Sequence, residues 1–144
     1  ITSNNEVNTW SIINHIWSNY KFIHIAVPVM TDKYKLKHYY ISEATKYMNN
    51  KYGIPEPINA IEYTGTHFDM VITPLLILDT HGYRVGYGNG IYDRMLKKYS
   101  TKYIVGLSYF ESINKIKDIS PFEVKLFDVK LSHCVTPKIV LNFT

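Results

Sequence analysis

Residues 82–99, GYRVGYGNGIYDRMLKKY, concentrate two scarce residue types in one short window. Four of the chain's seven glycines fall there, at Gly82, Gly86, Gly88 and Gly90. Its only two arginines, Arg84 and Arg94, lie in the same window, although lysine is common elsewhere. The chain is rich in Ile, Asn, Lys and Tyr, a bias typical of an AT-rich coding genome. Positions that run against this bias therefore carry the most information.

The window is expected to join a buried strand to a helix. The preceding run 68–78, FDMVITPLLIL, is almost continuously apolar, which is typical of a strand buried on both faces. After the glycines, four apolar residues recur at the spacing of one helical face: Ile91, Met95, Leu96 and Tyr99. Glycines permit positive φ, and a helix N-terminus offers unpaired N–H groups, so this arrangement can hold an anion. In α/β sheets, ligands bind beyond the carboxyl ends of strands, where we expect this loop.

The rest of the chain alternates between helical and extended patterns. An apolar stripe from Val7 to Trp17 predicts a helix, and alternation from Phe22 to Val27, stopping at Pro28, predicts a strand. The sequence patterns predict strands over residues 36–41 and 103–110. They also predict one or two short strands over 132–143 and an extended loop over 52–60.

This alternation predicts an α/β fold, a single three-layer domain over residues 1–144 with a mostly parallel central sheet flanked by helices. No strand pattern precedes the first helix, so we expect an N-terminal segment to be missing from this sequence.

Composition limits the classes of function. With 144 residues, 46% hydrophobic and 19% charged, the chain is globular. The single cysteine, Cys134, excludes an intramolecular disulfide and is consistent with a reducing, cytoplasmic location. The longest apolar run, Met70 to Leu78, is too short to span a membrane, and no signal peptide opens the chain. A net charge of +4 suits an anionic partner, but on charge alone a soluble protein with a lysine-biased surface is the better explanation.

The common nucleotide motifs do not fit the glycine window. No Lys-Ser/Thr pair follows Gly90, as a Walker A loop requires, and the spacing of Gly86, Gly88 and Gly90 is not that of the dinucleotide fingerprint. The chain also lacks a His-Glu-x-x-His motif, a cysteine pair and a nucleophile elbow. From spacing alone, an anion-binding loop and a purely structural turn both remain open.

Three segments, taken together, resemble the 5-formyltetrahydrofolate cyclo-ligase family. They are NEVNT (5–9), YGIPEP (52–57) and VITPLLILDTHGYRVGYGNGIYDRML (71–96), in the family's order. The resemblance implies a ligase of folate metabolism that uses ATP and Mg²⁺. Such an enzyme closes 5-formyltetrahydrofolate to 5,10-methenyltetrahydrofolate and releases ADP and phosphate. It also implies a cytoplasmic monomer with small-molecule partners and no nucleic-acid or membrane partner.

The same resemblance suggests roles for individual residues. It implies ATP binding by Gly86, Tyr87, Gly88, Asn89, Gly90 and Tyr92. It implies folate binding by Ile1, Glu6, Tyr52, Tyr87, Asn89, Gly90 and Ile91. Catalytic roles would fall to Tyr92 and Arg84, and metal binding to Asp93 and Asp128.

Several positions depart from the family pattern. Ile91 replaces the first of two tyrosines, Val29 stands where a basic residue is common, and Ser132 replaces a second magnesium-associated aspartate. The family's basic N-terminal segment has no counterpart here. These departures leave open a non-catalytic homologue that binds folate or nucleotide. An RNA-binding domain is a third possibility, against which the scattered lysines count. The carboxylate of Asp93 could also serve only to stabilise a helix dipole.

Overall fold

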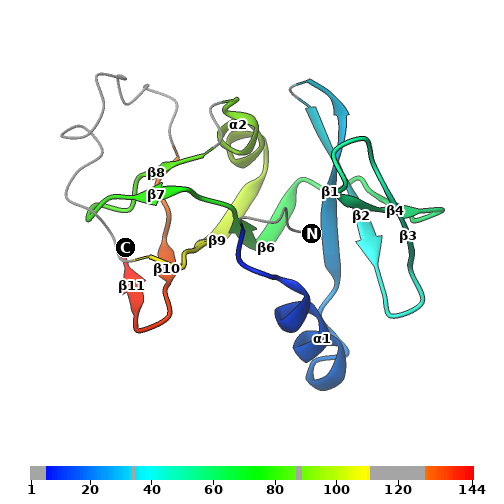
Figure 1. Ribbon diagram of the computed structural model, residues 1–144, viewed down its shortest axis with the longest axis horizontal. Helices are drawn as coiled ribbons and strands as arrows, with labels where there is room; N and C mark the ends of the chain where they lie inside the picture. Colours follow the sequence, from blue (N-terminus) through cyan, green and yellow to red (C-terminus); the bar gives the residue numbers. More distant parts are fainter. Residues whose placement is uncertain (1–5, 34, 87–88, 111–128) are drawn as a thin grey trace. The chain divides into compact units, whose positions relative to one another are not determined.

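The computed structural model describes residues 6–33, 35–86, 89–110 and 129–144 (Figure 1). It divides into two compact units, Ile1–Gly65 and Thr66–Thr144, which are described separately below. The prediction of a single domain over residues 1–144 stays a prediction. Within the described ranges, neither helix has the length or apolar character needed to cross a membrane.

The first unit combines one helix with two small antiparallel sheets. Helix α1 (Trp10–Asn19) precedes a sheet of order β1-β2-β5, made of β1 (Ile25–Asp32), β2 (Lys35–Ile41) and β5 (Glu62–Tyr63). Strands β3 (Lys46–Asn49) and β4 (Pro55–Ile58) form a separate hairpin. The core consists of Ile13, Val27 and Ile41, with Trp10, Trp17, Ile25 and Tyr47 packed against it.

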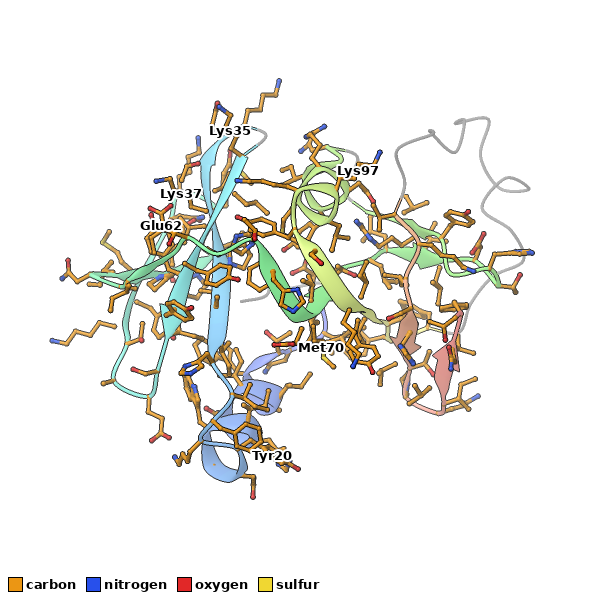
Figure 2. The ribbon with its side chains drawn as sticks, turned by 180° about the vertical axis from the view of Figure 1, so that it is seen from behind. Tyr20, Lys35, Lys37, Glu62, Met70 and Lys97 are labelled. Atoms are coloured by element: carbon orange, nitrogen blue, oxygen red, sulfur yellow. The ribbon has the colours of Figure 1, made fainter. Side chains whose placement is uncertain are left out.

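The predicted apolar stripe of α1 is the face that the first unit buries. Ile13 is buried, and Trp10 meets the ring of Tyr47 edge-on at 5.2 Å between centroids, a favourable aromatic geometry. On the sheet, Lys37 Nζ of β2 and Glu62 Oε2 of β5 form an ion pair at 2.9 Å (Figure 2). The carboxylate of Glu62 raises the pKa of Lys37, because its hydrogen bond and its negative charge both favour the protonated amine.

Strand β1 runs through the proline at which the sequence predicted it would stop. Pro28 pairs with His38 within the β1–β2 register, which extends from Ile25 to Asp32. Among the described residues β1 pairs with β2 alone, so it is an edge strand. Proline is tolerated on an edge strand because the missing N–H can fall on the unpaired side. The strand also begins three residues later than the alternation suggested.

The second unit is built around a mixed sheet of order β11-β10-β9-β6. Its strands are β6 (His67–Thr73), β9 (Ser100–Leu107), β10 (His133–Val135) and β11 (Val140–Asn142). The pairs β6–β9 and β9–β10 are parallel, whereas β10–β11 is antiparallel. Strands β7 (Ile77–Leu78) and β8 (Arg84–Val85) form a hairpin, and helix α2 (Ile91–Lys98) follows before β9 (Figure 1).

The prediction of a three-layer α/β domain with a mostly parallel sheet is wrong. The described residues form four separate sheets, most of whose pairings are antiparallel, and contain two helices. The reason lies in the connections. Only two residues separate β1 from β2, and a connection of that length can join only antiparallel neighbours. Parallel pairing needs a long crossover, which the segment containing α2 supplies between β6 and β9.

Two further expectations about strands need correction. The apolar run 68–78 is not one strand, because β6 ends at Thr73, directly before Pro74, and β7 is part of a different sheet. Met70 is 54% exposed on β6, which is an edge strand, so the run is not buried on both faces (Figure 2). The proline-rich segment 52–60 contains β4, in which Glu56 pairs with Met48.

Candidate functional site

The glycine loop connects the β7–β8 hairpin to helix α2. It follows Val85, which pairs with Ile77, and ends where α2 begins at Ile91. The loop therefore does not follow the carboxyl end of a parallel strand, as the sequence had suggested, because Pro74 separates β6 from the hairpin. Gly90 is the residue before α2 and has φ of 58°, a left-handed conformation that glycine adopts without a steric penalty.

The hairpin before the loop is fixed by an aspartate at its turn. The carboxylate of Asp79 accepts the N–H groups of His81 at 2.9 Å and Tyr83 at 2.7 Å. Gly82 lies in this turn with φ of 90° and donates its own N–H to the carbonyl of Asp79. The carbonyl of Gly82 accepts the N–H of Leu131, which ties the turn to the segment before β10. The Asp-x-x-Gly pattern thus positions the strand that leads into the loop.

The two ends of the glycine loop are joined by an ion pair. Arg84 Nη2, on β8, donates to Asp93 Oδ1, in the first turn of α2, at 3.0 Å. The side chain of Arg84 is 3% exposed and that of Asp93 is 17% exposed. The same oxygen of Asp93 accepts the backbone N–H of Val129 at 3.1 Å. Asp93, a residue of α2, therefore links this helix to β8 and to the segment before β10.

The remaining described loop residues surround this pair. The guanidinium of Arg84 lies 5.9 Å from the ring centroid of Tyr92, within cation–π range. Arg94 donates to the carbonyl of Asn89, so the second arginine braces the end of the loop. The structure thus brings together Arg84, Tyr92 and Asp93, whose roles the resemblance had implied.

Other predicted site residues lie elsewhere or outside the described part of the chain. Glu6 and Tyr52 belong to the first unit, and Tyr52 is 65% exposed. Ile91 is the first residue of α2. The predictions for Ile1, Tyr87, Gly88 and Asp128 fall outside the described residues. The hydroxyl of Ser132 bonds both the N–H and the carbonyl of Ile104, each at 2.9 Å, so it serves the backbone of β9.

Sequence reasoning missed Asn50, which organises the turn that carries Tyr52. Asn50 Oδ1 accepts the N–H of Tyr52 at 2.9 Å and of Ile54 at 3.1 Å. Its Nδ2 donates to Glu56 Oε1 at 2.8 Å. An asparagine just before a glycine-containing hairpin turn is the available signal, because Asx side chains commonly accept backbone N–H groups two residues on.

The residues present fit a magnesium ion only as a partial site. Across the described ranges, no group of three or more His, Cys, Asp or Glu side chains could hold a metal. Mg²⁺ is, however, commonly bound by one or two carboxylates, with substrate phosphates and water completing the shell. Both donors to Asp93 that the structure describes reach Oδ1. The single carboxylate of Asp93 beside the glycine loop is therefore compatible with a magnesium ion whose other ligands come from substrate and water.

The sequence matches a known enzyme family over nearly its whole length. Residues 1–137 match the 5-formyltetrahydrofolate cyclo-ligase family. This chain belongs to that family. The family predicted from the three segments is therefore confirmed, and this family consists of ligases.

Individual relatives agree with the family match. The chain is 27% identical over 129 residues to the 5-formyltetrahydrofolate cyclo-ligase of Haemophilus influenzae, covering 86% of this chain and 68% of that protein. It is 25% identical over 136 residues to the cyclo-ligase of Escherichia coli K12, covering 92% and 72%.

A solved structure shows the same fold. The NMR structure of Aquifex aeolicus 5,10-methenyltetrahydrofolate synthetase matches 99% of this chain and 69% of its own, with a TM-score of 0.77 and 23% identity. The fold of this chain is therefore similar to that of the Aquifex protein.

Proposed function

We propose that this cyclo-ligase family member closes 5-formyltetrahydrofolate to 5,10-methenyltetrahydrofolate, with ATP as cosubstrate and ADP and phosphate as products. The observation that carries the proposal is the glycine loop, whose two ends are joined by Arg84 and Asp93 within a chain that matches the family over residues 1–137. A loop that precedes a helix N-terminus suits the phosphates of ATP, because it presents backbone N–H groups to an anion.

The reaction that follows from these substrates has two steps. The formyl oxygen of the substrate attacks the γ-phosphorus of ATP, and ADP leaves. The neighbouring anilinic nitrogen then attacks the activated formyl carbon and the C–N bond forms. That nitrogen loses its proton, and phosphate leaves with the former formyl oxygen. The protein's contribution is to position the reactants and to neutralise charge as it moves between oxygens.

Within this proposal, the loop residues Gly86, Asn89 and Gly90 and the start of α2 bind the phosphates. Tyr92 packs beside the reacting groups, and Arg84 supplies positive charge behind the loop. Asp93 would hold magnesium, which neutralises phosphate charge when bound. In the first unit, Glu6 would bond the pterin and Tyr52 would offer an aromatic surface. We also propose that the chain acts as a cytoplasmic monomer.

The test is ATP-dependent formation of methenyltetrahydrofolate, followed by its absorbance, with and without Mg²⁺. We expect Asp93→Ala to lower turnover by more than tenfold, since the phosphates lose both the metal ligand and the ion pair that joins the loop ends. The matched control is Asp69→Ala, because the Asp69 side chain is 97% exposed on β6 and remote in sequence from the loop. Tight binding of both ligands without turnover would establish a non-catalytic homologue instead.

A further inference from the structure

We propose that Arg84 and Asp93 act as a clasp that holds the two ends of the glycine loop together and so positions the loop for phosphate. In this role Arg84 is a positioning residue, and Asp93 has a function separate from metal binding. The part of the proposal that concerns phosphate rests on the proposed function. The part that concerns the loop itself rests on the geometry alone.

The clasp spans the loop at its base. Arg84 is the first residue of β8 and Asp93 the third residue of α2, and the 3.0 Å bond between them joins the elements on either side of the glycines. Both partners are largely removed from solvent, with 3% and 17% side-chain exposure. Water screens such a pair less than it screens a pair on the surface, so the attraction between the two charges is stronger.

Asp93 is the main polar anchor of the buried guanidinium. Arg84 Nε is buried and has no hydrogen-bond partner among the residues that the structure describes. The ring of Tyr92 contributes a cation–π contact at 5.9 Å. Removing the carboxylate would therefore leave a buried cation with little to hold it, and removing the cation would leave Asp93 with the N–H of Val129 as its remaining described donor.

The loop backbone passes directly against the clasp. A Cβ built on Gly86 would lie 3.3 Å from Arg84 Nη1, a tight contact, so the guanidinium lies close beside the backbone of the first loop residue. A displaced guanidinium would therefore move the first residue of the loop. At the other end, Asp93 Oδ1 also accepts the N–H of Val129. Oδ1 therefore accepts two hydrogen bonds from the protein, whereas the proposed magnesium ligand would be Oδ2.

If Asp93 and Arg84 form a clasp, breaking their bond should loosen the loop even when no metal is present, which a role in metal binding alone would not predict. We would compare wild type, Arg84→Met, Asp93→Asn and the double variant by NMR amide exchange in ligand-free protein with EDTA. Each single variant should speed exchange at Gly86, Asn89 and Gly90 by at least about tenfold, and the double variant should be no faster than either one. Exchange in β9 measures global opening, and Asp69→Asn is the control for removing an exposed carboxylate.

Positioning for phosphate has its own readout. Both single variants should raise the Kd for ATP measured in EDTA, again without additivity, and Arg84→Lys should restore part of the loss. Additive effects, or loop exchange that Arg84→Met leaves unchanged, would overturn the clasp and leave Asp93 as a metal ligand only. If Arg84→Met fails to fold, the cycle is run with Arg84→Lys. If wild-type protein forms no methenyltetrahydrofolate, the proposed function is overturned. The clasp is supported all the same if the single and double variants show non-additive effects on loop exchange.

Discussion

Gly82→Ala should destabilise the second unit more than a left-handed glycine substitution normally does. Gly82 has φ of 90°, and a Cβ built there would lie 2.6 Å from Phe143 Cγ and 2.9 Å from two further atoms of that side chain. Left-handed backbone costs an L-residue about 1–2 kcal/mol. Displacing a packed ring adds about 1–3 kcal/mol, the range seen for overpacked cores. We therefore expect a total loss of about 2–5 kcal/mol.

Gly53 provides the matched control for the backbone contribution. It has φ of 73°, but no atom lies within 4 Å of the position a Cβ would take. Gly53→Ala should therefore lose only about 1–2 kcal/mol. The difference between the two variants isolates the contact with Phe143, which packs against the core of Leu78, Leu131 and Cys134.

Urea unfolding followed by circular dichroism gives the free energies, and calorimetry reports whether the two units unfold together. At about 2–4 °C per kcal/mol for a chain of this size, Gly82→Ala should lower Tm by about 4–20 °C. In a Phe143→Ala background, the part of the extra loss that comes from the ring should disappear, while the contact with Cβ of residue 143, 2.9 Å from the built Cβ, remains. Equal losses for Gly82→Ala and Gly53→Ala would show that the ring does not constrain the turn, and the reasoning would fail.

Two other substitutions test features of the two units. Asn50→Ala should destabilise the β3–β4 hairpin by about 1–3 kcal/mol, because two N–H groups lose their acceptor; Asn50→Asp, measured by urea unfolding, should retain most of the stability. The fully buried thiol of Cys134 should resist iodoacetamide at pH 8 in native protein, since burial raises its pKa to about 11. The unfolded thiol ionises near pH 9, so stability should fall as pH rises from 9 to 11, and Cys134→Ala should reduce that slope.

Local patterns predicted the two helices and most of the strands, but not the strand bounds. The stripe with Trp10 and Ile13 became α1, and the face with Met95 and Leu96 became the buried side of α2. What failed was the assembly of strands into sheets. Apolar content does not distinguish a central parallel strand from an exposed edge, and Met70 shows the difference, being 54% exposed within an apolar run. The short connection between β1 and β2 was the better guide to antiparallel pairing.

The candidate site was predicted as a set of residues but not as a geometry. Scarcity of glycine and arginine marked the loop, and the roles of its residues were implied by the resemblance and stay predictions. The bond between Arg84 and Asp93 could not be predicted from the sequence, because they are nine positions apart and no single helical or strand period places them together. Asn50 was missed because the asparagine-rich composition made any one asparagine look uninformative.

Pro28 has a consequence for how this protein behaves at high concentration. Without Pro28, the segment 25–30, IAVPVM, would be a short, uncharged stretch rich in β-branched residues, on a strand that pairs on one side only among the described residues. Such stretches template intermolecular strand addition, and a proline interrupts the row of donors that a second chain would need. Pro28 thus acts as a gatekeeper against fibrillar association, and replacing it with valine should make inclusion bodies more abundant during expression.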